Sequence, residues 1–175
     1  MPVLTRENMQ PEFLSGEASA NPAVPVLLAG ARRLAEAGFG RGALCARNGP
    51  RVTTHANLPF ELLTDQDFLE VADYDPHLDR LLCIGKRDPT PHAGLVHLIF
   101  RAKKEIGALA LVEAPAAVGA LPAATRGRTT LENALGILEA LRGRDAVAWG
   151  NYVVATGRSA DEALALAARL VGAPA

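Results

Sequence analysis

His92 and Glu113 are the two side chains whose types and positions best suit proton-transfer chemistry in this sequence. His92 ends the segment Pro89-Thr90-Pro91-His92 at the start of a predicted helix, and Glu113 follows the apolar run 107–112. The positive end of a helix dipole disfavours a protonated imidazole, so a neutral His92 could act as a base or as a ligand. A carboxylate at a strand end could carry a proton or bind a metal. These two residues are the candidate catalytic pair.

Both residues also have a purely structural explanation, which we prefer. His92 would then be an exposed polar residue of a first helical turn, and Glu113 a strand-end carboxylate at the sheet surface or at a subunit contact. His97 lies five residues further on, about 140° round the helix, so it cannot face the same point as His92. A rebuilt metal site that joins His92 and Glu113 to either His55 or Asn151 would need separate segments to converge. The chain has no CxxC or HxxxH pair, so its spacing does not predict a metal site.

The elements that must position these residues alternate between helices and strands. Asn48-Gly49 is a strong hairpin signal between two short strands. Thr129-x-x-Glu132 and Ser159-x-x-Glu162 are capping boxes that each begin an amphipathic helix. The helix that carries His92 is expected to begin at Thr90, and the apolar run 107–112 is typical of a strand buried on both faces. This order predicts an α/β fold, a three-layer α/β/α sandwich with a central mixed, largely antiparallel sheet.

Length and composition indicate one domain. The chain has 175 residues, of which 49% are hydrophobic, enough for a substantial core. Residues 1–21 show no clear period and contain several helix breakers. We expect an N-terminal arm over 1–21, extended or disordered and ordered against a partner subunit, and a single domain over 22–175.

The charge pattern excludes several classes of partner. The formal net charge is −1, and no basic tract or basic-aromatic interleaving indicates nucleic-acid binding. No apolar run approaches the roughly 18–20 residues that span a bilayer, and the polar start of the chain does not resemble a secretory signal. Cys45 and Cys83 lie in apolar runs, as buried thiols of a cytoplasmic protein would. We therefore expect a cytoplasmic protein that binds neither nucleic acid nor membranes.

Four segments resemble the class II aldolase/adducin family in their order and spacing. Residues 42–47 are similar to the family's Gly-Asn-hydrophobic-Ser-hydrophobic-Arg strand, and residues 63–67 to its Leu-Thr-x-x-Asp. Residues 89–92 are similar to Pro-Ser-Ser-Glu, and residues 153–163 to the closing strand-Gly-x-Ser-x-x-Glu-Ala segment. The resemblance covers roughly residues 22–172 and implies the family's three-layer fold.

The family's catalytic residues are replaced at the matching positions. Its chemistry uses three histidines that bind a divalent, zinc-type metal and a glutamate that moves the proton. By the resemblance, the histidines fall on Val112, Ala114 and Asn151, and the glutamate falls on His92. The asparagine of the phosphate loop falls on Ala43. The pocket positions that match the family are therefore Ala43, Val112, Ala114, Asn151 and Tyr152.

The resemblance implies a diverged class II aldolase-like protein with a binding or structural role. Valine and alanine cannot ligate a metal, so we expect no metal cofactor and no metal-dependent aldol cleavage. The alternative is a lyase or epimerase that acts on a small (phospho)sugar through a rebuilt site around His92 and Glu113. Family members commonly form tetramers, which implies a homo-oligomer here, and the expected ligand is a small anion or a sugar.

Overall fold

An eight-stranded sheet runs through the centre of the molecule. The computed structural model describes residues 9–174. The strand order is β1-β5-β4-β3-β2-β6-β8-β7, and neighbours are antiparallel except for the parallel pair β1 and β5. The strands are β1 (Gln10–Ser15), β2 (Gly42–Asn48), β3 (Arg51–His55), β4 (Phe68–Asp75), β5 (Arg80–Ile84), β6 (Ala108–Glu113), β7 (Ala146–Trp149) and β8 (Tyr152–Gly157).

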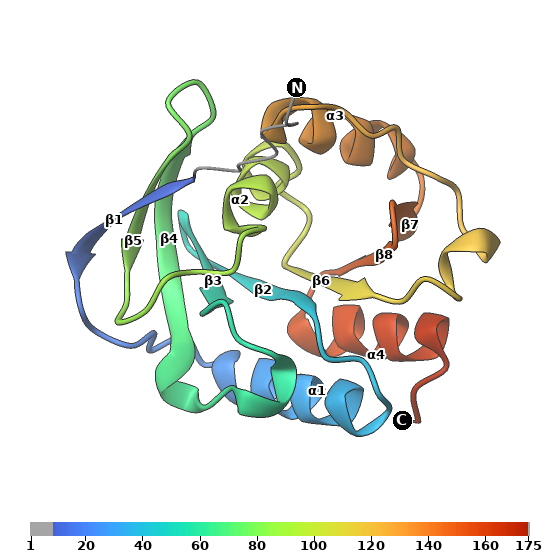
Figure 1. Ribbon diagram of the computed structural model, residues 1–175, viewed down its shortest axis with the longest axis horizontal. Coiled ribbons are helices and arrows are strands. Elements are labelled where there is room, and N and C mark those ends of the chain that lie inside the picture. Colours follow the sequence, from blue (N-terminus) through green and yellow to red (C-terminus); the bar gives the residue numbers. More distant parts are fainter. Residues whose placement is uncertain (1–8, 175) are drawn as a thin grey trace, which may run out of the picture.

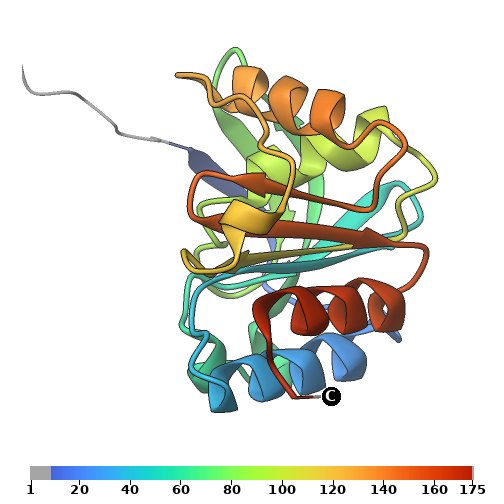
Figure 2. The ribbon, with the colours of Figure 1, turned by 90° about the vertical axis from the view of Figure 1, so that its right-hand side faces the viewer.

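Helices cover both faces of this sheet. Helices α1 (Val24–Glu36) and α4 (Ala160–Val171) lie on one face, and α2 (Ala93–Ala102) and α3 (Thr130–Ala140) lie on the other, as Figures 1 and 2 show. The short 3-10 helices are η1 (Phe60–Leu62), η2 (Asp65–Asp67) and η3 (Val118–Ala120). The predicted three-layer sandwich with a mixed, largely antiparallel sheet is confirmed.

Strand β6 shows why the sheet has a core on each face. Its apolar residues alternate, so that Leu109 and Leu111 join the core under α2 and α3. Ala110 and Val112 join the core under α1 and α4. Successive side chains of a strand point to opposite faces, so a continuous apolar run can serve two helical layers. This confirms the prediction of a doubly buried strand.

Local capping signals fix the starts of two helices, α3 and α4. The Thr129 hydroxyl accepts a hydrogen bond from the Glu132 N–H at 3.1 Å, and the Ser159 hydroxyl accepts one from the Glu162 N–H at 3.3 Å. Helix α2 departs from the prediction: it begins at Ala93, with His92 rather than Thr90 as its N-cap residue. The Thr90 carbonyl accepts a hydrogen bond from the Ala93 N–H at 3.1 Å, so residues 90–93 form a turn before the helix.

The described part of the expected arm packs against the chain's own sheet. Residues 10–15 form the edge strand β1, and the Gln10 N–H donates to the Asp79 carbonyl at 2.9 Å. Backbone alternation then turns the Pro11 position to the outer edge, where proline offers no N–H to another strand. The Ser19 hydroxyl donates to the buried Glu70 carboxylate at 3.0 Å. Residues 1–8 of the arm, and residue 175, lie outside the described residues.

None of the helices within residues 9–174 has the length and apolar character that crossing a bilayer requires. Cys45 and Cys83 are buried free thiols, as their apolar surroundings predict.

Candidate functional site

A cavity of about 280 Å³ opens at one end of the sheet, where β2 and β8 begin and β3 ends. Backbone hydrogen bonds hold its separate walls together. The Thr90 N–H donates to the His55 carbonyl, and the Asn57 N–H donates to the Asp88 carbonyl, both at 2.9 Å. The turn before α2 is therefore fixed beside the end of β3. The cavity is lined by Arg41, Gly42, Asn57, Leu58, Pro59, Thr90, Pro91, His92 and Tyr152.

His92 contributes a neutral imidazole to this cavity. Its ring lies edge-on to the ring of Tyr152, with centroids 5.0 Å apart, and to that of Trp149 at 6.0 Å. Burial, and to a smaller extent the nearby His55, lowers the pKa of His92 to about 4. The imidazole is therefore unprotonated at neutral pH and can accept a proton or a hydrogen bond from a ligand.

His55 lies at the end of β3 next to the cavity and does not line it. It is fully buried, and its Nε2 accepts a hydrogen bond from the Leu44 N–H at 3.1 Å, which requires Nδ1 to carry the proton towards the Ala56 carbonyl at 2.8 Å. Burial lowers the pKa of His55 to about 4. His55 thus links β3 to β2 through the hydrogen bond from Leu44 and has a structural role.

Glu113 lies close to the cavity but outside its lining. It is half-buried at the end of β6 and pairs across the sheet with Tyr152. Tyr152 packs on the α2 and α3 face, so Glu113 lies on the face opposite to Val112. Within residues 9–174, no hydrogen bond or ion pair involves its carboxylate. The structure therefore brings His92 and Tyr152 together at the cavity. Glu113, the cross-strand partner of Tyr152, lies beside the cavity lining and is not part of it.

The other pocket positions implied by the resemblance are mostly removed from the cavity. Val112 is fully buried under α1 and α4, and Ala43 is fully buried on the opposite face. Ala114 is buried, and its N–H donates to the Asn151 carbonyl at 2.9 Å. The Asn151 side chain is exposed at the turn between β7 and β8. Of these positions, only Tyr152 lines the cavity.

Two polar residues of the cavity, Asn57 and Thr90, were not predicted as site residues. The sequence offers Arg41 only as one of four scattered arginines that could form an anion site, and a solvated role is preferred for it. Arg41 and Asn57 are exposed, whereas Thr90 is almost fully buried. The signal for Thr90 was present, because it occupies a serine position of the family's Pro-Ser-Ser-Glu segment. Arg41 and Asn57 stand in loops that carry no motif of their own, so only the folded arrangement identifies them.

Gly42 allows β2 to pass close to β6 at the cavity wall. Its φ is +148°, and a Cβ atom added to it would lie 1.7 Å from the Leu111 carbonyl oxygen. Only glycine adopts this conformation at this distance without strain. The approach lets the Glu113 N–H donate to the Arg41 carbonyl at 2.9 Å and so fixes the position of Arg41.

The residues at this end of the sheet do not fit a divalent metal. Zinc normally takes three or four nitrogen, sulfur or oxygen ligands from Cys, His, Asp or Glu. Val112 and Ala114 have no donor atom, and among the described residues that line the cavity only His92 is of a type that zinc commonly binds. The part of the chain that the structure describes contains no group of three His, Cys, Asp or Glu side chains that could hold a metal ion.

Solved structures with a similar fold include several aldolases. No family model and no curated protein sequence matches the chain. An L-fuculose 1-phosphate aldolase is similar over 89% of this chain and 84% of its own, with 15% identity and a TM-score of 0.68. The L-fuculose-1-phosphate aldolase of Thermus thermophilus shows 19% identity over 85% and 89% of the two chains, with a TM-score of 0.68. A sugar-phosphate aldolase of Thermotoga maritima shows 15% identity over 86% and 90%, with a TM-score of 0.64.

Proposed function

We propose that this chain, which has the fold of the class II aldolases, binds a small anionic, hydroxylated ligand in the His92 cavity without a metal ion. Arg41 is the only side chain with a full charge at pH 7 among the described residues that line the cavity. Its guanidinium would pair with a phosphate or carboxylate. The Thr90 hydroxyl, the Asn57 amide and neutral His92 offer hydrogen bonds suited to the hydroxyl groups of a small sugar derivative.

The observation that carries the metal-free part of this proposal is the burial of Val112. Its side chain is fully buried in the core under α1 and α4, at the position that the resemblance assigns to the first metal-binding histidine. A packed isopropyl group has no lone pair and leaves no room for a ligand. This supports a protein that keeps the fold and has lost the metal-dependent aldol cleavage of the family.

Glycerol 3-phosphate tests the proposed ligand class, because it carries a phosphate and two hydroxyl groups and cannot be cleaved by an aldolase. Isothermal titration should show binding, and glycerol, the neutral analogue, should bind far more weakly. We expect Arg41→Gln to weaken glycerol 3-phosphate binding at least tenfold, because a hydrogen bond to a charged group contributes about 1.5–3 kcal/mol.

The matched control is Arg32→Gln, which removes an exposed arginine of α1 that does not line the cavity. It should bind glycerol 3-phosphate as the native chain does. Equal affinity in Arg41→Gln, or no binding at millimolar concentration, would overturn the proposed ligand class.

The second candidate is a lyase or epimerase that uses His92 as its base. The specific observation in its favour is the neutral imidazole of His92 in the cavity lining, beside Tyr152. Such an enzyme would exchange the proton next to a carbonyl group with solvent. Metal-independent uptake of deuterium by dihydroxyacetone phosphate, lost in His92→Gln, would establish this activity. Its absence in the native chain would exclude it. Glu113 would need to move towards the cavity to take part.

We also propose that the chain forms a homo-oligomer, with a tetramer favoured by the family resemblance. The exposed leucines of α3, Leu131 and Leu135, support an association surface, since they lie four residues apart on one helical face. Sedimentation velocity on the native chain tests this, and a single monomeric species at about 100 μM would contradict it.

A further inference from the structure

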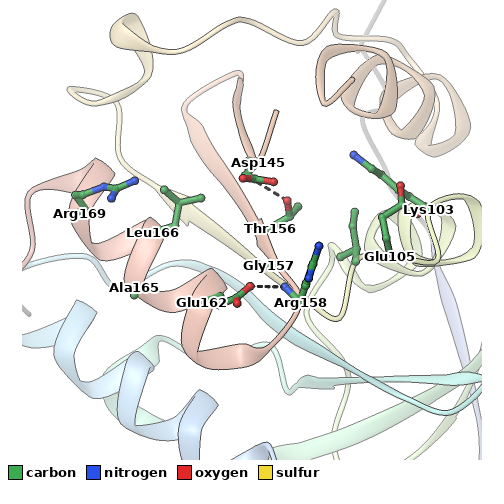
Figure 3. A pocket seen from close by; sticks show the side chains of 11 residues that line it. Lys103, Glu105, Asp145, Thr156, Gly157, Arg158, Glu162, Ala165, Leu166 and Arg169 are labelled. Carbon is green, nitrogen blue, oxygen red and sulfur yellow. Dashed lines mark hydrogen bonds between the residues drawn. The ribbon is translucent and has the colours of Figure 1, made fainter. Parts of the chain in front are cut away.

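A second and larger cavity, of about 560 Å³, lies at the opposite end of the sheet from His92. Strand β8 runs between the two cavities: Tyr152 at its start lines the first, and Thr156 and Gly157 at its end line the second. Figure 3 shows α4 along one side of this second cavity and the residues that follow α2 on the other. It is lined by Lys103, Glu105, Ile106, Asp145, Thr156, Gly157, Arg158, Glu162, Ala165, Leu166 and Arg169.

The charged side chains of this cavity are not paired with one another. The Lys103 ammonium donates to the Leu141 carbonyl at 3.3 Å, and the Glu162 carboxylate accepts from the Arg158 N–H at 2.9 Å. Over residues 9–174, no hydrogen bond or ion pair involves the guanidinium of Arg169 or the carboxylate of Glu105. The cavity therefore presents unpaired charges of both signs, which favours a partner that also carries both signs.

Four of these residues form one stripe along α4. Glu162, Ala165, Leu166 and Arg169 follow the spacing i, i+3, i+4 and i+7, which places them on one face of a helix. Glu162 lies in the first turn and Arg169 in the last, about 10.5 Å apart along the axis. Ala165 is exposed and Leu166 is half-buried, so the middle of the stripe is apolar.

This stripe is complementary to itself when reversed. If a two-fold axis passes between Ala165 and Leu166, Glu162 of one copy lies opposite Arg169 of the other, and the reverse pair forms as well. The same axis places the small Ala165 opposite the larger Leu166, which suits helices packed about 8–10 Å apart. An isologous contact requires this kind of self-complementary surface.

We propose that α4 pairs in antiparallel orientation with α4 of a second copy of this chain, through Glu162, Ala165, Leu166 and Arg169. The contact rests on the proposed homo-oligomer and identifies one of its interfaces, at the end of the sheet away from the His92 cavity. An acidic first turn and a basic last turn also suit the dipole of an isolated helix. The charge arrangement must therefore be tested through association.

Exchanging the charges of α4 distinguishes the proposed contact between two copies from the helix-dipole explanation. Sedimentation velocity over a range of concentrations would compare the native chain with Arg169→Glu, which places two carboxylates opposite each other in the contact. We expect association to weaken at least tenfold. The double variant Glu162→Arg with Arg169→Glu reverses both charges and should recover most of the association. Ala165→Arg, at an exposed helical position, should block the close approach without changing the fold.

Glu162→Gln is the control for helix capping, because its amide oxygen can still accept from the Arg158 N–H. It should unfold at nearly the native temperature and associate more weakly. Oligomers that persist unchanged in both Arg169→Glu and Ala165→Arg would overturn the α4 contact and leave the homo-oligomer intact. A double variant that associates no better than Arg169→Glu would also overturn it. A native chain that stays monomeric would overturn both proposals.

Discussion

Gly42→Ala will lower the free energy of unfolding by about 3 kcal/mol or more, and it will abolish glycerol 3-phosphate binding. The new Cβ would lie 1.7 Å from the Leu111 carbonyl oxygen, at a backbone φ of +148°. Both the clash and the strained conformation must be relieved by moving β2 away from β6. Arg41 precedes Gly42 and lines the cavity. The same movement therefore displaces Arg41, the residue that we propose binds the anion. Urea unfolding and isothermal titration measure the two effects.

Gly119→Ala is the matched control for this substitution. Gly119 is exposed in η3, and a Cβ atom added there would have no neighbour within 4 Å. Its stability should stay within about 1 kcal/mol of the native chain, with a small gain as the expected sign. If Gly42→Ala were as stable as Gly119→Ala, the close approach of β2 and β6 described above would be wrong.

Acidification from pH 7 to pH 4 will destabilise the protein, with His55 contributing about 3 kcal/mol of the loss. Burial lowers the pKa of His55 from 6.5 to about 4 in the folded chain, and each pKa unit corresponds to about 1.4 kcal/mol. Between these two values the unfolded chain binds the proton and the folded chain does not. The contribution of His55 to the free energy of unfolding is therefore fully present above pH 6.5 and is lost as the pH falls towards 4.

His55→Gln isolates this contribution. Glutamine can still accept from the Leu44 N–H but does not titrate, so the free energy of unfolding should depend less steeply on pH. His92 and His97, whose pKa values burial also lowers, contribute to the slope that remains. A native slope in His55→Gln would show that the His55 imidazole is not held in its neutral form by burial.

Local sequence signals predicted most of the fold, because each of them is formed by residues that are close together in the sequence. The Asn48-Gly49 turn, the capping box at Thr129, the N-cap at Ser159 and the doubly apolar β6 all lie where the sequence indicates. The second predicted capping box is only half formed, because the Glu162 carboxylate accepts from the Arg158 N–H. Strand β4 was not predicted, because Glu70 interrupts its apolar residues. In the folded chain Glu70 is buried, and its carboxylate accepts hydrogen bonds from Ser19 and from Thr53 at 3.0 and 2.6 Å. Such partners are far apart in sequence, so no local pattern shows them.

The site was less predictable, because the residues that line it are also far apart in the sequence. The sequence places His92 at a helix start, where the structure has it as the N-cap residue of α2, and strand alternation places Glu113 and Val112 on opposite faces of the sheet. The approach of Arg41 and Asn57 to His92 depends on how β2, β3 and β6 are paired. That pairing is non-local, so the polar lining of the cavity emerges only from the tertiary structure.

The most direct test of our central proposal, that a chain with the class II aldolase fold lacks the metal-dependent chemistry, is solvent exchange into dihydroxyacetone phosphate. The protein would be incubated with this ketone in D₂O, once after chelation and once with added Zn²⁺, and deuterium next to the carbonyl group would be followed by NMR. We predict that Zn²⁺ with the protein gives no more exchange than the same Zn²⁺ in buffer. Protein-dependent exchange that appears with Zn²⁺ and disappears on chelation would contradict it.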